Sequence, residues 1–212
     1  PLNKVAAIPV ATSGLTYYGA AKLQTELDLF RYWFIPQLLR LEWTQDLDTG
    51  FAGLSQCLIA NAAEQPQVVV HRDFHSRNLM VVGNSELAVI DFQDAVIGPI
   101  TYDPVSLLKD CYISWPRQQQ IAWLLDYKGL LIAERQLAAI DDETFTAWFD
   151  LMGLQRHIKV LGIFARLCLR DGKSAYLDDL PLVIAYVIQA LAIYAPSLPA
   201  IARFAEVFDE QV

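Results

Sequence analysis

Residues 71–82 read HRDFHSRNLMVV, and after the turn residues Gly83-Asn84-Ser85 the chain continues as LAVID at 87–91. The two apolar segments are short and rich in β-branched residues, and the turn residues tolerate a positive φ. We therefore expect the segments to pair as an antiparallel hairpin. Because a hairpin returns the chain to the edge where it started, Asp91 should come back beside Asn78, although thirteen residues separate them.

Three oxygen-bearing side chains meet at the mouth of this predicted hairpin: Asp73, Asn78 and Asp91. Oxygen ligands of this kind suit Mg²⁺, which takes one or two protein oxygens together with phosphate oxygens and water. Phosphoryl transfer needs a metal that neutralises phosphate charge and a group that orients the attacking hydroxyl. We expect Asn78 and Asp91 to hold the metal, and Asp73 to be the catalytic carboxylate.

The order and spacing of these residues resemble the protein-kinase-like superfamily, whose catalytic loop reads HRDxxxxN. The segment DFQDA at 91–95, followed by GPITYD at 98–103 and by no APE motif, looks like the aminoglycoside phosphotransferase and choline kinase family. Together with GLQRH at 153–157 and GIFARL at 162–167, these strings most resemble the bacterial kinases that phosphorylate N-acetylmuramate and N-acetylglucosamine at the anomeric hydroxyl. The resemblance covers most of the chain from about residue 20.

This resemblance implies ATP as co-substrate, Mg²⁺ as cofactor and a small-molecule acceptor. It implies that Arg77, Asn78 and Asp91 contact the nucleotide or its metal; for Arg77 the alternatives are a place near the transferred phosphate, a contact with the substrate, or a solvated side chain. The helical region after residue 118 would then shape the acceptor pocket, and its candidate substrate residues are Arg156, His157 and Arg166. A basic stripe along one helical face is either a solvated surface or a contact for an anionic group; it comprises Arg156, Lys159, Arg166 and Arg170.

The other polar residues of the motif have expected supporting roles. We expect His71 to pack beneath the loop rather than to touch substrate, and Arg72 to hold the loop. Asp103, before Pro104, is expected to be a helix N-cap that also braces the catalytic loop. Asp94 is either a neighbour of the metal ligands or a partner of its own turn, and no role is assigned to His75.

The composition excludes several classes of protein. Of the 212 residues, 54% are hydrophobic and 19% charged, which predicts a large buried core and little disorder. The net charge of −8 argues against nucleic acid and against anionic membranes as partners. The three cysteines form no CxxC pair, and the richest apolar stretch, 180–201, is broken by Gln189, Pro196 and Pro199. We therefore expect a soluble cytoplasmic protein with reduced thiols.

The predicted fold class is α+β and mostly α: the C-terminal lobe of a protein-kinase-like fold, with a small β-hairpin insert that carries the catalytic loop. Residues 1–20 are expected to be an extended lead-in or linker, and 21–212 the catalytic and acceptor-binding lobe. Helices are expected at 22–40, 46–64, from 103 onward, and at 118–135, 142–170 and 178–195. Strands are expected at 68–70, 79–82 and 87–90.

No segment before residue 71 has the pattern of a phosphate-covering loop or of a lysine on a β-branched strand. The resemblance therefore predicts that an N-terminal nucleotide lobe belongs to the parent protein and is absent from this chain, which would be inactive alone. Two alternatives stay open: a kinase for aminoglycosides or another small molecule, and a pseudokinase-like binding module without catalysis.

Overall fold

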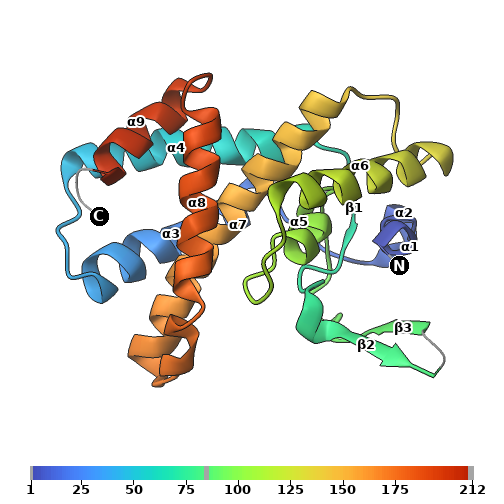
Figure 1. Ribbon diagram of the computed structural model, residues 1–212, viewed down its shortest axis with the longest axis horizontal. Helices are drawn as coiled ribbons and strands as arrows, with labels where there is room; N and C mark the ends of the chain where they lie inside the picture. The colour runs from blue at the N-terminus through green and yellow to red at the C-terminus, as the bar shows by residue number, and fades with distance from the viewer. Residues whose placement is uncertain (1, 84–85, 210–212) are drawn as a thin grey trace. The chain divides into compact units, whose positions relative to one another are not determined.

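The computed structural model describes residues 2–83 and 86–209, and the chain in this part is mostly helical (Figure 1). The helices are α1 (Leu2–Ala6), α2 (Val10–Ser13), α3 (Ala20–Leu29), the π-helix η1 (Phe30–Leu38), α4 (Gln45–Glu64), the 3₁₀ turn η2 (Ser76–Asn78), α5 (Tyr102–Leu108), α6 (Arg117–Ala133), α7 (Asp142–Asp171), the 3₁₀ turn η3 (Ser174–Leu177), α8 (Leu180–Tyr194) and α9 (Pro199–Asp209). The strands are β1 (Gln67–Val70), β2 (Leu79–Val82), β3 (Glu86–Val89) and β4 (Val96–Pro99). The fold class predicted from the sequence, mostly α with small antiparallel sheets, is confirmed.

Contacts within the chain define two compact units. The first comprises Pro1–Gly19 and Ala62–Met152, and it contains all four strands. The second comprises Ala20–Asn61 and Gly153–Val212, and the elements within its described residues are all helices joined by short loops.

The first unit is built around a small sheet in which β1 pairs antiparallel with β4, with Val68 opposite Gly98. Both strands turn mostly buried residues to the interior because apolar side chains occupy nearly every position. Tyr17 forms an isolated bridge to Ile97, and the ring of Tyr18 packs edge-on against Tyr102 at 5.3 Å. Residues before α3 are therefore part of this unit's packing.

The second sheet of the first unit is the predicted hairpin. Strands β2 and β3 pair antiparallel, with Leu79 opposite Val89 and Val82 opposite Glu86. Of the predicted turn residues, Asn84 and Ser85 lie outside the described part of the chain. The hairpin extends away from β1 and α5 (Figure 1) and exposes Met80, Val81 and Leu87.

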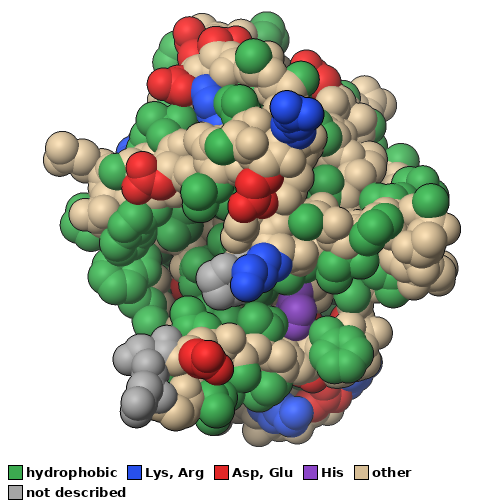
Figure 2. All heavy atoms as spheres, turned by 90° about the vertical axis from the view of Figure 1, so that its right-hand side faces the viewer, with side chains coloured by type: hydrophobic (Ala, Val, Ile, Leu, Met, Phe, Trp, Pro, Cys, Tyr) green, Lys and Arg blue, Asp and Glu red, His purple; other side chains and the backbone are tan. Residues whose placement is uncertain are grey.

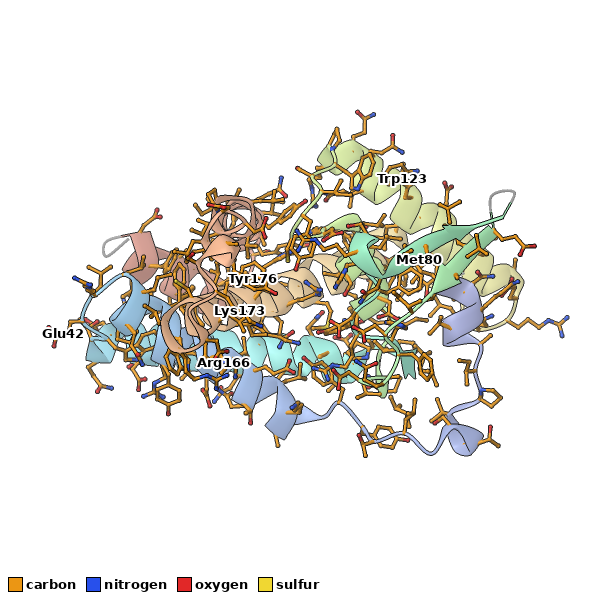
Figure 3. All side chains as sticks on the ribbon, turned by 90° about the horizontal axis from the view of Figure 1, so that it is seen from below. Glu42, Met80, Trp123, Arg166, Lys173 and Tyr176 are labelled. Atoms are coloured by element: carbon orange, nitrogen blue, oxygen red, sulfur yellow. The ribbon has the colours of Figure 1, made fainter. Side chains whose placement is uncertain are left out.

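Hydrophobic side chains recur across the face of the molecule that carries this hairpin (Figure 2). Met80 on β2 and Trp123 on α6, both labelled in Figure 3, are exposed residues of the first unit. The face therefore leaves apolar surface in contact with water.

The second unit has an aromatic core. The ring centroids of Phe30, Phe51 and Phe204 lie 5.6 to 6.4 Å from one another. The ring of Phe208 stacks on that of Phe204, with 5.4 Å between the centroids. Such offset and edge-on pairs add to the stabilisation from burial. They join η1, α4 and α9, which are far apart in sequence, into one interior.

Helix α7 approaches the junction of α3 and η1 closely at Gly162. A Cβ atom built on this glycine would lie 2.3 Å from the carbonyl carbon of Leu29 and 2.4 Å from the amide nitrogen of Phe30. Backbone atoms cannot yield as a flexible side chain can, so only glycine fits here.

Several predictions of local structure need correction. The helix expected at 22–40 begins as α3 but continues from Phe30 as a π-helix that includes Pro36. The amide of Leu39 bonds to the carbonyl of Phe34, five residues earlier, and this wider pattern accommodates a proline that has no N–H of its own. The extended conformation expected for the first residues is wrong at α1 and α2, and α9 and β4 were not predicted.

The segment Ser174–Tyr194, which includes α8, is 21 residues long with a mean hydropathy of 1.5, enough to cross a membrane by length and composition. A core helix satisfies the same criteria. Val183, Val187 and Leu191 of α8 are buried along one face, while 33% of the apolar window as a whole is buried.

Candidate functional site

The loop at 71–78 is held by a buried carboxylate from α5. The backbone amides of His71 and Arg72 donate to the two oxygens of Asp103 at 2.8 and 3.0 Å, and Asp103 is 5% exposed. The predicted bracing of the loop by Asp103 is therefore confirmed. The predicted N-cap role is wrong, because Thr101 precedes the helix and Asp103 lies within its first turn.

The hairpin brings Asn78 and Asp91 together as predicted. Its ladder continues one residue beyond the strands, since the amide of Ile90 donates to the carbonyl of Asn78 at 3.1 Å. The side-chain Nδ2 of Asn78 lies 3.5 Å from Oδ2 of Asp91 and donates to the backbone carbonyl of Asp73 at 3.0 Å. Asn78 thus connects Asp73, on the catalytic loop, to Asp91, which follows the hairpin.

Two residues of the site have left-handed backbone conformations. Arg72 has φ 73° and Asp91 has φ 71°, values that are uncommon for residues with a side chain. Arg40 and Arg135 show the same conformation in other turns, so it is not confined to the site. At Asp91 it makes the chain leave the hairpin abruptly, which keeps the carboxylate at the hairpin mouth.

The carboxylate of Asp73 is half-buried, and within residues 2–83 and 86–209 no hydrogen bond or ion pair engages it. It is therefore available to accept a hydrogen bond from an alcohol. His71 lies beneath it, 4% exposed and edge-on to Phe74 at 5.8 Å, as the predicted packing role requires. Burial lowers the pKa of His71, and this effect outweighs the opposing influence of Asp73, the Ile90 carbonyl and Asp91.

The residues at the hairpin mouth fit a magnesium ion. Both side-chain hydrogen bonds of Asn78 use its nitrogen, which leaves the Oδ1 oxygen for a cation. Asp91 accepts side-chain amide N–H groups from Asn78 and Gln93, one on each carboxylate oxygen, so both oxygens face positively polarised groups. The described residues contain no cluster of three or more His, Cys, Asp or Glu side chains suited to a metal. One carboxylate and one amide oxygen nevertheless suffice for Mg²⁺ when substrate phosphates complete the coordination.

Arg77 stacks on an aromatic ring that follows α5. Its guanidinium carbon lies 3.4 Å from the centroid of the Tyr112 ring, and the His75 ring meets the same tyrosine edge-on at 5.6 Å. The carboxylate of Asp110, 1% exposed, accepts the backbone amides of both Ser76 and Tyr112 at 2.9 and 3.1 Å. The second half of the loop is thus held by Asp110 and Tyr112.

Asp110 and Tyr112 are functional residues that no sequence motif marks. Both lie more than thirty residues after the loop, and nothing in their spacing distinguishes them from ordinary residues at the end of a helix. The one available signal was that Asp103 precedes, and Asp110 closely follows, the mostly apolar segment 104–108.

A buried ion-pair cluster lies next to Asp110. Lys109 and Arg117 both pair with Asp150, at 2.7 and 2.6 Å, and Asp150 is buried. Burial alone would raise the pKa of Asp150, but the two cations outweigh it and lower that pKa. Burial lowers the pKa of Lys109 against the attraction of Asp150. With two cations on one carboxylate, the cluster fixes the end of α5.

The candidate substrate residues Arg156, His157 and Arg166 all lie on α7 in the second unit. Arg156 and His157 are 6% and 1% exposed, and His157 stacks on Tyr186 at 4.7 Å. Arg166 is half-buried in the turns that also carry Phe164, on which Tyr176 packs at 5.0 Å (Figure 3). Their contact with substrate stays a prediction.

The basic stripe is not a continuous solvated face. Lys159 is 9% exposed and pairs with buried Glu26 at 3.1 Å, whereas Arg170 is exposed and pairs with its neighbour Asp171. The cations at the start of the stripe are therefore enclosed, and the interpretation of the whole stripe as a solvated surface is wrong.

Comparison with known proteins places this site in a family. A family model described as "Phosphotransferase enzyme family" matches residues 2–140. The N-acetylmuramate/N-acetylglucosamine kinase of Pseudomonas putida is 44% identical over 173 residues, which are 82% of this chain and 51% of that protein. The protein of the same name from Neisseria meningitidis serogroup B is 37% identical over 211 residues, 93% of this chain and 59% of the relative. The chain spans about half the length of the curated relatives it matches.

Solved structures agree on the fold. A Plasmodium vivax ethanolamine kinase superimposes with a TM-score of 0.61 at 12% identity, covering 89% of this chain and 56% of that one. Aminoglycoside 2′-phosphotransferase-IIIa, in its GDP complex, gives 0.57 at 19% identity, covering 89% and 59%. These likenesses confirm the predicted fold class. Because the family model covers more than half of the residues, including the loop, the hairpin and α5, the chain belongs to the phosphotransferase enzyme family.

Proposed function

We propose that the protein is an ATP-dependent kinase that phosphorylates a hydroxyl of a small molecule, with an amino sugar as acceptor and its anomeric hydroxyl as the reacting group. The observation that carries this proposal is the approach of Asn78 to Asp91 at 3.5 Å, with the unengaged carboxylate of Asp73 on the same loop. Relatives named N-acetylmuramate/N-acetylglucosamine kinase support the choice of acceptor.

Each site residue has a defined task in this proposal. Asp73 accepts a hydrogen bond from the acceptor hydroxyl and takes its proton as the oxygen bonds to the γ-phosphorus of ATP, while the bond from that phosphorus to the β,γ-bridging oxygen breaks and ADP leaves. Oδ1 of Asn78 and the carboxylate of Asp91 hold Mg²⁺, which when bound neutralises charge on the phosphates. Arg77 places a further positive charge near the transferred group.

The two carboxylates have different tasks because their surroundings differ. Asp91 accepts amide N–H groups and is exposed at the hairpin mouth, which suits a charged metal ligand. Asp73 is half-buried without such donors and lies above His71, whose pKa is lowered by burial. His71 is 4% exposed, so its imidazole is closed off from an incoming acceptor, and the proton-accepting role belongs to Asp73.

The proposal also concerns regions outside the site. The domain assignment, with residues 21–212 as the catalytic and acceptor-binding lobe, belongs to it, as do substrate contacts by Arg156, His157 and Arg166. We propose that the part of the relatives that this chain does not span supplies a nucleotide lobe, so that the chain alone turns over little ATP. We place the protein in the cytoplasm, where amino sugars released from the cell wall would be recycled.

The test is ADP release by the complete protein, measured with a panel of N-acetylated amino sugars, choline, ethanolamine and aminoglycosides. We expect turnover with amino sugars that is abolished by EDTA and restored by Mg²⁺. Asp73→Asn should lower kcat about 100- to 10,000-fold, as expected for loss of a general base, and Asp91→Asn about 100- to 1,000-fold.

Glu86→Gln, an exposed carboxylate at the far end of β3, is the matched control and should leave activity unchanged. Turnover confined to aminoglycosides would replace the amino-sugar assignment with the second candidate, an aminoglycoside kinase. That candidate is favoured only by the fold it shares with aminoglycoside 2′-phosphotransferase-IIIa. Binding of nucleotide without turnover of any acceptor would instead indicate a pseudokinase-like module and refute the kinase proposal.

A further inference from the structure

One contact in the first unit is not explained by metal binding or proton transfer. The guanidinium of Arg77 lies flat against the Tyr112 ring, 3.4 Å from its centroid. Arg77 is exposed, and among residues 2–83 and 86–209 no carboxylate forms an ion pair with it. An exposed arginine without an acid partner normally samples many rotamers, so the stack restricts a side chain that would otherwise be mobile.

The position of Tyr112 is set by the same carboxylate that holds the loop. Asp110 uses one oxygen for the amide of Ser76, next to Arg77, and the other for the amide of Tyr112. Asp110 is 1% exposed, so these charge-assisted bonds are shielded from water. The buried carboxylate of Asp110 therefore fixes the distance between the loop backbone next to Arg77 and Tyr112, on whose ring Arg77 stacks.

Arg77 directly precedes Asn78, the residue whose side chain bonds toward both Asp73 and Asp91. The ring of His75 supports Tyr112 from its edge, at 5.6 Å. A fixed cation in this segment costs no reorganisation at the moment when negative charge shifts on the phosphates, which is the condition for effective electrostatic stabilisation.

From this arrangement we infer that Asp110 and Tyr112 are positioning residues for Arg77: they hold its guanidinium in one orientation for phosphoryl transfer. The inference rests on the proposed kinase function, and it assigns both residues a role that acts through Arg77 and not through contact with substrate. Loss of Tyr112 should therefore matter only while Arg77 is present, and loss of Asp110, which also holds the amide of Ser76, should matter less once Arg77 is removed.

The test is a double-mutant cycle in the complete protein with ATP and the best acceptor of the panel. Arg77→Ala should lower kcat about 100-fold. Tyr112→Leu should lower kcat about 3- to 30-fold, the range expected for a cation–π contact, and leave both KM values within about two-fold. Tyr112→Phe keeps the ring and should restore kcat. In the Arg77→Ala background, Tyr112→Leu should have no further effect.

Ile113→Ala, an exposed neighbour in the same turn, is the matched control and should change neither constant. Asp110→Asn provides a second cycle should Tyr112→Leu fail to fold; because Asp110 also holds the amide of Ser76, its effect on kcat should become smaller, but not vanish, in the Arg77→Ala background. If Tyr112→Leu or Asp110→Asn lowers kcat by the same factor with and without Arg77, the positioning role is refuted while the kinase function stands. If the wild-type protein phosphorylates no acceptor, the proposed function fails and this inference fails with it.

Discussion

Replacing Asp103 by Asn tests whether a single carboxylate holds the first half of the catalytic loop. Asp103 is 5% exposed and accepts the amides of His71 and Arg72 at 2.8 and 3.0 Å. Hydrogen bonds to a charged group contribute about 1.5–3 kcal/mol each. An asparagine keeps one acceptor oxygen but turns its NH₂ group toward the other amide, so one bond is lost and one weakened. We expect the loop to be destabilised by about 2–3 kcal/mol.

The assay is amide hydrogen exchange on the complete protein, which reports the opening of individual amides. A loss of 2–3 kcal/mol corresponds to exchange about 30- to 150-fold faster at His71 and Arg72. Because the loop carries Asp73, kcat should fall with it. The control is Asp141→Asn, since Asp141 also accepts a backbone amide, that of Thr144 at 2.7 Å, but lies outside the loop. It should leave exchange at the loop unchanged.

Unchanged exchange at His71 and Arg72 in the Asp103→Asn protein would refute the bracing argument. So would equal acceleration in the Asp141→Asn protein, which would indicate a general loss of stability.

Three further outcomes are expected. In chemical denaturation, Gly162→Ala should destabilise the protein by about 1–3 kcal/mol or more, because the added Cβ would lie 2.3 Å from a backbone carbon. Gly129→Ala, on an open face of α6, should instead stabilise it by about 0.5–1 kcal/mol in the same assay. Asp150→Asn should cost about 3–5 kcal/mol in that assay, because it leaves the buried ammonium of Lys109 without its carboxylate, and a loss below 1 kcal/mol would contradict the charged cluster. Because burial lowers the pKa of His71, the folded state binds fewer protons than the unfolded state, and the stability of the protein should fall as the pH drops below about 6.5. The melting temperature of a His71→Leu protein should therefore fall less between pH 7.5 and pH 5.5 than that of the wild type. An identical fall in both proteins would contradict burial of His71 as the cause.

The hairpin and the approach of its flanking residues could be predicted because both depend on local sequence. The two short β-branched segments and the turn residues between them predicted the ends of β2 and β3 to within one residue. Antiparallel pairing of these strands then required Asp91 to lie near Asn78. The helices α4, α6, α7 and α8 followed from apolar spacing in the same way, with ends within two residues of those expected.

The features that could not be predicted depend on distant contacts. Strand β4 contains Gly98 and Pro99, which disfavour strands, and it forms because β1 offers a paired edge. The π-helix around Pro36 depends on packing that no local propensity describes. The contacts of Asp110 with Ser76 and of Tyr112 with Arg77 join segments more than thirty residues apart, and no spacing rule connects them.

The anchors of the loop are Asp103, in the first turn of α5, and Asp110, two residues after α5 ends at Leu108. Each residue of a helix advances 1.5 Å and turns 100°. One residue inserted into α5 would therefore rotate Asp110 about the helix axis by more than a quarter of a turn. Asp103 and Asp110 could then no longer both hydrogen-bond the loop. Among related proteins, this segment should thus vary in side chains but keep a constant length, whereas the hairpin can lengthen without moving either anchor.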